Sequence, residues 1–299
     1  MVGRNVREHA EAAKWEVIGP ARAELDLKDL SAVRAFVQQE KPDVVVHTAG
    51  RVGGIHTNAS DPINFLIDNV DLGRNVIMTA FEEGVPALVN LATSCMYPRN
   101  LPGPLRESDI LTATLEPTNE GYAIAKIMAA RLCAYIRAQY PDRQYKTLIP
   151  CNLYGRFDKF SPESSHLVPA IVDKVVRARN SGADTIEIWG DGTARREFLY
   201  AADLADAIWK AVNDMAAVPD IMNVAIGVDH SILEYYETVA AVAGWKGSFR
   251  FNLDRPVGVR SKLCDVTKQT AWGWAPRTGL EDGIRQTLAY YEQASDRLR

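Results

Sequence analysis

Two different spacings of apolar residues alternate along the first half of the chain. Short apolar runs such as DVVVH at 43–47 predict buried strands, and the longer segments between them carry apolar residues at helical spacing. Strands separated by helices imply right-handed crossovers and a parallel sheet. The predicted elements are a strand at 16–18, a helix at 30–40 whose start is marked by Asp29 or Ser31, strands at 43–47 and 86–92, helices at 62–83 and 121–140, and a strand at 145–150.

The pattern loosens from about Phe157, where Gly, Pro and Ser interrupt shorter elements. We therefore expect an α/β fold with a Rossmann-type doubly wound parallel sheet in residues 1–156, to which some later segments return. Residues 157–299 are expected to form mainly a smaller C-terminal α/β lobe that binds the substrate. The later predicted elements are helices at 167–179, 201–214, 231–243 and 279–293, and strands at 185–189, 221–224 and 248–251.

Composition narrows the possible functions. The 299 residues carry a net charge of −4, which gives no reason to expect a nucleic-acid partner. No apolar run approaches the ~18 residues of a membrane span, and the N-terminal segment is too charged for a signal peptide. The four cysteines lie far apart without the spacing of metal ligands or of a disulfide framework. We expect a cytoplasmic protein that has no metal site and no membrane association.

Tyr122 and Lys126 in GYAIAK lie four positions apart on a predicted helix, so both side chains project from one face. A nearby ammonium lowers the pKa of a phenol, and such a pair can pass a proton to or from a substrate oxygen. Alone, the spacing is weak evidence, because an exposed pair on a solvated helix face is more common. Thr93, Ser94 and Cys95 follow an apolar strand, at the end where open parallel sheets bind their ligands.

Seven motifs extend this pattern in a fixed order: RVGGI (51–55), SCMYP (94–98), LEPTNEGYAIAK (115–126), NLYG (152–155), SSHLVPA (164–170), WGDGTARREFLY (189–200) and LCDVTK (263–268). With a Ser or Thr after a strand and YxxxK on the next long helix, the chain resembles the extended short-chain dehydrogenase/reductase family. More closely it resembles the GDP-L-fucose synthases, which are GDP-4-keto-6-deoxy-mannose 3,5-epimerase/4-reductases. The resemblance runs from Met1 to about Glu292.

The resemblance implies that Thr93, Tyr122 and Lys126 form the reductase set, in which Tyr122 protonates the C4 oxygen of the sugar. It also implies that Cys95 and His166 exchange protons at C3 and C5, which the 4-keto group acidifies. Hydrogen bonds from Tyr122 and Thr93 would stabilise the enolate on O4. Without the resemblance, Cys95 would be a small core residue and His166 a cap of the following helix.

Arg196 in TARREF matches a family position that contacts the substrate nucleotide, and a guanidinium suits a pyrophosphate. Its neighbour Arg195 is expected to be a surface charge. Val257 stands for a usual acidic residue and Ser261 for a usual arginine, which leaves a related GDP-4-keto sugar, such as a heptose or a dideoxy sugar, as an alternative substrate. The resemblance implies further substrate contacts by Trp189, Lys174, Ser94 and Asp265.

The segment VIGPAR lacks the acidic residue that would hydrogen-bond an NAD ribose, and its Arg22 suits the 2′-phosphate of NADP(H). Asp26 and Leu27 match an adenine contact, although Asp26 could equally be a turn residue. His47 is expected to have a structural role. The resemblance implies further cofactor contacts by Gly3, Ala49, Lys126, Asn152 and His166.

Met1, Val2 and Gly3 match the end of the GxxGxxG turn with which the family begins, where amides at a helix start hold the cofactor pyrophosphate. We expect the first strand and the first two glycines of that motif to lie some ten residues upstream of Met1. The alternatives are a genuine truncation and a non-catalytic nucleotide-binding remnant.

The family usually dimerises through two long helices per subunit, which here would be the helices at 62–83 and 121–140. A homodimer is therefore expected, although the apolar pattern of these helices also fits burial inside one chain.

Overall fold

Four parallel strands form the central sheet of the computed structural model, which describes residues 1–161, 165–254 and 260–296. The strands are ordered β1 (Val44–His47), β2 (Ala87–Leu91), β3 (Gln144–Pro150) and β8 (Ile221–Val224). The parallel sheet predicted from the alternating pattern is therefore confirmed. All four strands point the same way, so their carboxyl ends share one edge of the sheet.

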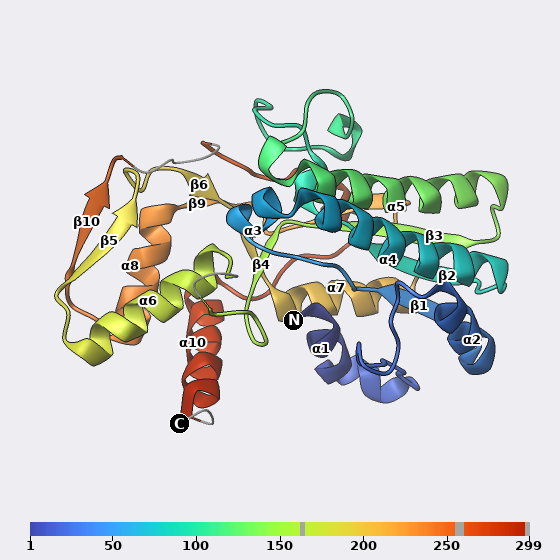
Figure 1. Ribbon diagram of the computed structural model, residues 1–299, viewed down its shortest axis with the longest axis horizontal. Helices are drawn as coiled ribbons and strands as arrows, with labels where there is room; N and C mark the ends of the chain where they lie inside the picture. Colours follow the sequence, from blue (N-terminus) through green and yellow to red (C-terminus); the bar gives the residue numbers. More distant parts are fainter. Residues whose placement is uncertain (162–164, 255–259, 297–299) are drawn as a thin grey trace.

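Helices cover both faces of this sheet (Figure 1). The helices α2 (Leu30–Glu40), α4 (Pro62–Glu82) and α5 (Glu120–Gln139) bury a common core against one face. The helices α1 (Val2–Glu8) and α7 (Ala201–Asn213) pack on the other face. The doubly wound arrangement is therefore confirmed. Within the described residues, no helix has both the length and the apolar character needed to cross a membrane.

The start of α2 shows how sequence chemistry places an element. The Asp29 carboxylate accepts hydrogen bonds from the backbone amides of Ser31 and Ala32, at 2.9 and 3.1 Å. Of the two predicted start residues, Asp29 is therefore the N-cap.

The prediction of a strand at 16–18 is wrong. These residues form extended coil, and Val17 and Ile18 are 37% and 47% exposed. A strand forms only where a neighbour supplies hydrogen-bond partners, and no described strand lies beside this segment. For the same reason β1 is an edge strand, and its three valines are half-buried rather than fully buried as predicted.

A second core lies in the later part of the chain. It is built from α6 (Leu167–Ser181), α8 (Ile232–Ala243), α10 (Leu280–Asp296) and the parallel pair β5 (Thr185–Trp189) and β10 (Ser248–Asn252). Each of these elements was predicted within a few residues of its bounds. By contrast, α7 and β8 return to the first sheet.

Several short elements were not predicted, because they span too few residues to show a period. They are η1 (Ala10–Lys14), α3 (Ile55–Ser60), η2 (Ser94–Met96), η3 (Glu107–Asp109), η4 (Pro117–Asn119), β4 (Asn152–Tyr154), β6 (Arg195–Arg196), β7 (Phe198–Tyr200), β9 (His230–Ser231) and α9 (Thr267–Ala271).

A close approach between α10 and β4 leads to a stability prediction. A Cβ atom added to Gly283 would lie 2.8 Å from the ring carbon Cζ of Tyr154, which is 1% exposed and cannot move aside. Alanine usually stabilises a helix interior relative to glycine by about 1 kcal/mol. We expect Gly283→Ala to destabilise instead, by about 1–2 kcal/mol in urea unfolding, because overpacking a core outweighs helix propensity.

The matched control is Tyr154→Phe, which removes the hydroxyl oxygen nearest to the added methyl group. The double variant should recover part of the loss that the single Gly283→Ala variant shows. A Gly283→Ala variant more stable than the parent chain would contradict the packing argument.

Candidate functional site

The carboxyl end of β2 carries the first group of candidate residues. The chain turns there into η2, and the Thr93 hydroxyl accepts a hydrogen bond from the Cys95 amide at 3.3 Å. Cys95 is half-buried, whereas Cys133, Cys151 and Cys264 are buried. The sulfur of Cys95 is therefore the accessible thiol among the four, which disfavours the alternative that it is an ordinary core residue.

Helix α5 brings Tyr122 and Lys126 to this edge. The Lys126 Nζ atom donates to the Leu91 carbonyl oxygen at 2.9 Å and lies 6.0 Å from the centroid of the Tyr122 ring. The structure therefore brings the predicted tyrosine–lysine pair next to the segment that follows β2. The pair is not a solvated surface pair, because Lys126 is only 7% exposed.

Burial, rather than the charge of the neighbour, dominates the titration of this pair. Desolvation lowers the pKa of Lys126 to about 8. Desolvation raises the pKa of Tyr122, the nearby Cys95 raises it further, and hydrogen bonding by Thr93 opposes both. In the chain without a bound ligand, the prediction that Lys126 lowers the pKa of Tyr122 is therefore wrong. Tyr122 is a neutral phenol, and thus a proton donor, at neutral pH.

Asn119, which the sequence analysis did not single out, completes this part of the site. Its side-chain nitrogen donates to the Cys95 sulfur at 3.4 Å. A hollow of ≈ 260 Å³ opens beside it, and Phe65, Pro117 and Tyr122 are among its lining residues. The only sequence signal was position, since Asn119 lies three residues before the candidate tyrosine.

His166 lies on a different element, at the start of α6. It is the N-cap residue of that helix, as the alternative expected, but its exposed side chain makes no capping hydrogen bond. Partial desolvation, followed by the charge of Lys159, lowers its pKa below 6.5, so the imidazole is neutral at pH 7.

Two contacts relate this segment to the Cys95 region. A Cβ atom on Gly54 would lie 3.6 Å from the Ser165 carbonyl oxygen, so the chain before His166 passes close to the start of α3. Helix α3 in turn packs against η4, which ends at Asn119. The segments that carry Cys95 and His166 are therefore linked through the region of α3.

The candidate cofactor residues lie along the same edge of the sheet. Gly3 at the start of α1 lies against Thr48, whose hydroxyl would be 3.1 Å from an added Cβ atom. Ala49 and Gly50 follow, and an added Cβ atom on Gly50 would lie 3.5 Å from Lys126 Nζ. Gly3 and Gly50 therefore let the backbone lie close against Thr48 and Lys126.

Asn69 pins this loop by accepting from the Arg51 amide and donating to the Arg51 carbonyl oxygen, at 2.9 and 3.1 Å. His47, at the end of β1, is buried, and desolvation followed by the charge of Lys126 lowers its pKa to about 3. A permanently neutral imidazole agrees with the structural role expected for His47.

The remaining cofactor candidates are placed less closely. Arg22 is exposed, and its guanidinium has no partner within the described part of the chain. The Asp26 carboxylate accepts from the Lys28 amide at 3.0 Å and so forms a turn, the alternative raised for it above. The Leu27 carbonyl oxygen accepts from the Asn75 side chain at 3.0 Å.

Asn152 lies farther along the chain, in β4, where its side chain donates to the Glu197 carbonyl oxygen at 3.0 Å. This bond ties β4 to the segment that carries the candidate substrate residue Arg196.

Arg196 is half-buried, and desolvation lowers its pKa. Its neighbour Arg195 keeps 44% of its side chain exposed, as a surface charge would, and it is paired with acidic residues. The Arg195 guanidinium binds the Asp229 carboxylate at 2.7 Å and lies 3.4 Å from Glu234. Because Arg195 and Arg196 are adjacent in a strand, their side chains point to opposite faces. Arg195 is held by acidic partners, whereas the Arg196 side chain faces a different environment.

The other candidate substrate residues are spread over both cores. Ser94 is buried in η2, and Trp189 is 50% exposed at the end of β5. Lys174 donates to the Glu187 carbonyl oxygen, and desolvation lowers its pKa. Asp265 accepts from the Thr267 amide at 2.9 Å and lies 3.4 Å from Arg106.

The two departures in the 255–265 segment have different outcomes. The Ser261 hydroxyl donates to Asp229 at 2.9 Å, so it joins the carboxylate that holds Arg195. Val257 lies outside the described residues.

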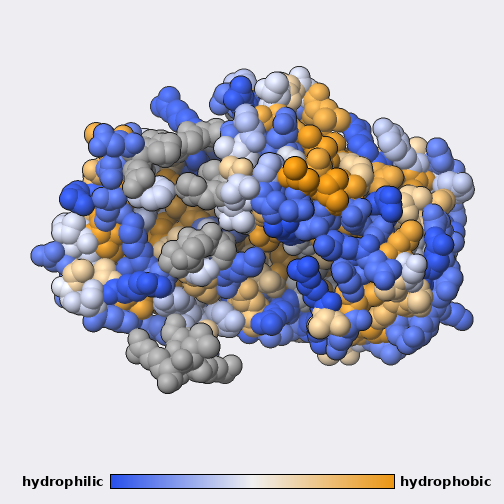
Figure 2. All heavy atoms as spheres, viewed as in Figure 1, coloured by the Kyte–Doolittle hydropathy of each residue, from blue (hydrophilic) through white to orange (hydrophobic). Residues whose placement is uncertain are grey.

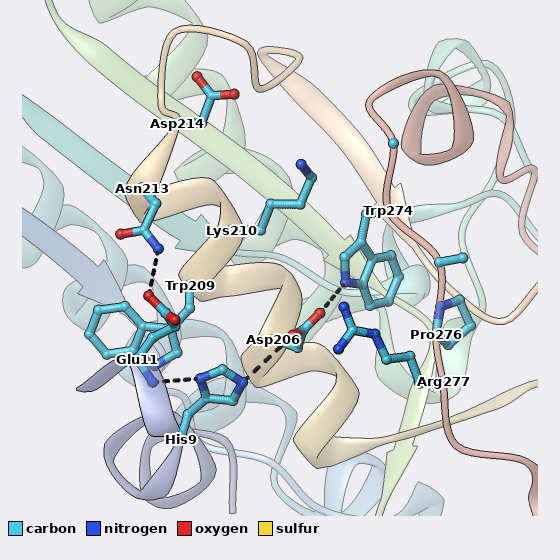
Figure 3. A pocket seen from close by; sticks show the side chains of 12 residues that line it. His9, Glu11, Asp206, Trp209, Lys210, Asn213, Asp214, Trp274, Pro276 and Arg277 are labelled. Atoms are coloured by element: carbon cyan, nitrogen blue, oxygen red, sulfur yellow. Dashed lines mark hydrogen bonds and ion pairs between the residues drawn. The ribbon is translucent and has the colours of Figure 1, made fainter. Parts of the chain in front are cut away.

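A larger hollow of ≈ 660 Å³ lies elsewhere, between η1, α7 and residues 273–277 (Figure 3). Its polar side chains bind one another. Trp274 donates to Asp206 at 2.8 Å, Asp206 lies 3.6 Å from His9, and Asn213 donates to Glu11 at 3.1 Å. None of the predicted site residues lines this hollow, so its size alone does not make it the candidate site.

The chain is similar to several known proteins. Residues 1–225 match the model of the NAD dependent epimerase/dehydratase family. The chain is 52% identical to a GDP-L-fucose synthase of Azorhizobium caulinodans, over 97% of this chain and 93% of that protein. It is 45% identical to a GDP-L-colitose synthase of Yersinia pseudotuberculosis, over 97% and 94%. A GDP-mannoheptose C4 reductase of Campylobacter jejuni, solved with NADP bound, superposes with a TM-score of 0.88 at 28% identity, over 97% and 95% of the two chains.

The buried ammonium leads to a prediction about stability. Lowering the pKa of Lys126 from 10.5 to about 8 costs about 3 kcal/mol at pH 7, because the unfolded chain binds the proton more tightly. Replacing Lys126 by methionine would remove this cost, but it would also remove the hydrogen bond to the Leu91 carbonyl oxygen, which offsets about 1 kcal/mol of the gain. We therefore expect Lys126→Met to stabilise the chain by about 2 kcal/mol in urea unfolding at pH 7.

The advantage of Lys126→Met over the parent should shrink as pH rises from about 8 to above 10.5, where Lys126 is neutral in both states. The exposed Lys28 provides the control, because Lys28→Met should change stability by less than about 0.5 kcal/mol. A pH-independent effect of Lys126→Met would show that desolvation of its charge is not the cause.

Proposed function

Because the chain belongs to the NAD dependent epimerase/dehydratase family, and within it to the GDP-L-fucose synthases, we propose that it converts GDP-4-keto-6-deoxy-D-mannose to GDP-L-fucose with NADPH. The observation that carries this proposal is the gathering of Thr93, Cys95, Tyr122 and Lys126 at one edge of the sheet. Such a cluster joins a proton donor, a hydroxyl and a thiol around a buried cation, as combined epimerisation and reduction requires.

The residues present fit a nicotinamide cofactor of the NADP type. Lys126 has three N–H donors but only the Leu91 carbonyl oxygen as a described acceptor, so it can bind the hydroxyl groups of a ribose. The unpaired guanidinium of Arg22 suits a 2′-phosphate. When bound, NADPH supplies the hydride that reaches C4 of the sugar. Gly3, Ala49 and Asn152 are part of the same proposed cofactor site.

In the proposed epimerisation, Cys95 and His166 remove and return protons at C3 and C5. The adjacent 4-keto group stabilises each carbanion as an enolate, whose negative charge develops on O4. Tyr122 and Thr93 donate hydrogen bonds to that oxygen, which lowers the barrier where the charge appears. The lowered pKa of His166 supports this role, because a neutral imidazole can accept a proton at pH 7.

In the proposed reduction, Tyr122 gives its proton to O4 as the carbonyl becomes an alcohol. The raised pKa of Tyr122 keeps the proton on the phenol until the oxygen becomes basic. Lys126 then stabilises the phenolate left behind. One pair of donors to O4 therefore serves both steps.

Arg196 is proposed to bind the pyrophosphate of the nucleotide, with Trp189, Lys174, Ser94 and Asp265 as further substrate contacts. A GDP-linked dideoxy sugar is the second candidate substrate, favoured by the 45% identity to the colitose synthase. A GDP-heptose is a further alternative. The 4-keto chemistry is common to all of these sugars, so the Cys95 region does not distinguish them.

We also propose a cytoplasmic homodimer. Helices α4 and α5 pack side by side, yet Ile63, Ile67 and Tyr135 on their outer faces are 74%, 50% and 61% exposed. Figure 2 shows hydrophobic residues on the part of the surface where these two helices lie. An exposed apolar face of this kind fits a second copy of the same two helices.

The catalytic proposal is tested by separating its two steps. With GDP-4-keto-6-deoxy-D-mannose and NADPH, the parent chain should form GDP-L-fucose. Tyr122→Phe should slow NADPH oxidation by at least about 100-fold, because it removes the proton donor. Cys95→Ala should abolish the exchange of solvent deuterium into C3 and C5, measured by NMR.

Tyr140→Phe serves as a control, because Tyr140 lies at the far end of α5 and contacts Phe81 instead. Consumption of another GDP-4-keto sugar without formation of GDP-L-fucose would transfer the proposal to that substrate. Retention of parental activity by Tyr122→Phe would overturn the mechanism.

The proposed dimer is tested by introducing a charge on the exposed face of α4 and α5. Ile67→Glu should convert a dimer to a monomer in light scattering without unfolding it, because the side chain is half exposed in one chain. Leu253→Glu is the control, since Leu253 is 73% exposed on the second lobe. A monomeric parent chain would refute the assembly.

A further inference from the structure

Asn119 occupies a helix-capping position but does not cap the helix. It is the N-cap residue of α5, where asparagine commonly accepts a hydrogen bond from an amide of the first turn. Its side chain makes no such bond here and turns instead toward the Cys95 sulfur, to which its nitrogen donates at 3.4 Å. The interaction favoured by local structure has been replaced by one with a candidate catalytic group.

The other end of the same amide is also unusual. The Asn119 side-chain oxygen is buried, and no described residue donates a hydrogen bond to it. A missing cap and an unpaired buried oxygen both reduce stability, so folding does not explain this orientation. Departures of this kind concentrate at functional sites. Asn119 and Tyr122 both line the hollow of ≈ 260 Å³ described above.

The chemistry of sulfur indicates what the contact between Asn119 and Cys95 does. A thiol is a weak hydrogen-bond acceptor, whereas a thiolate is the nucleophilic and basic form of cysteine. A donor aimed at the sulfur therefore fixes the orientation of the side chain. No lysine or arginine makes a described ion pair or hydrogen bond with Cys95, so the amide of Asn119 is its polar side-chain partner.

We propose that Asn119 is a positioning residue for epimerisation, which holds the Cys95 sulfur toward C3 and C5 of a sugar bound beside it. This proposal rests on the proposed function. It deepens that function by assigning the group that prepares Cys95 to remove a proton.

The test uses the full chain and measures the reactivity of Cys95 itself. Because the other three cysteines are buried, iodoacetamide should alkylate Cys95 selectively, and mass spectrometry of its peptide gives the rate. Asn119→Leu keeps the approximate shape and removes the donor, and it should slow alkylation about tenfold. Asn119→Asp should slow it further, because a carboxylate repels a thiolate.

The Asp variant also separates positioning from capping. Aspartate is as good an N-cap residue as asparagine, so a purely structural role predicts that Asn119→Asp behaves like the parent. Thr118→Ala is the matched control on the same turn, because among the described residues the Thr118 hydroxyl donates a hydrogen bond to Glu116 and none to Cys95. It should leave alkylation unchanged.

Activity provides the second readout. With NADP⁺ present, Asn119→Leu should reduce deuterium exchange at C3 and C5 about tenfold, mainly through kcat rather than KM. Parental rates of alkylation in both the Leu and Asp variants would overturn the proposal. The predicted order of alkylation rates in a chain that shows no sugar exchange would confirm that Asn119 controls the reactivity of Cys95, but it would reject the proposed function and with it the role in epimerisation.

Discussion

The hydrogen bond from the buried Lys126 ammonium to the Leu91 carbonyl oxygen is the interaction on which the arrangement of the site depends. A positive charge at this depth is stabilised by the Leu91 carbonyl oxygen, at the point where β2 ends. Its desolvation lowers the pKa of Lys126 to about 8, and its charge helps to keep the nearby His47 neutral. Gly50 lies against the ammonium, where the backbone approaches it closely. A charge held in this way has unused hydrogen-bond donors, and they are available to a ligand.

Desolvation also helps to give the neighbouring groups different roles. Tyr122 retains its proton because burial and the adjacent Cys95 both disfavour a phenolate. Cys95 accepts a hydrogen bond from the Asn119 amide, and that contact orients its sulfur. An acid and a base can therefore coexist within one small region. The difference between them comes from burial and from one hydrogen bond, because neither residue type has such a role by default.

The second core positions the residues that would select the substrate. Glu197 is buried beside Arg196, and its carboxylate accepts from the Gly227 and Cys264 amides at 2.6 and 2.8 Å. Through the same residue, Asn152 is tied to this segment. Arg195 is held by Asp229 in a separate network. Segments distant in sequence are thus joined by buried polar contacts, which are strong only where water is excluded.

The sequence by itself determined the long elements, the parallel sheet and the tyrosine–lysine pair, because apolar periodicity and residue spacing are local properties. It also singled out Cys95 and His166, through motifs shared with a family. Only the tertiary structure decided that 16–18 is not a strand, that burial raises the pKa of Tyr122, and that Arg195 is paired. It alone revealed Asn119 as the partner of Cys95. A strand partner, a desolvated environment and a side-chain contact all depend on segments far away along the chain, so no local pattern encodes them.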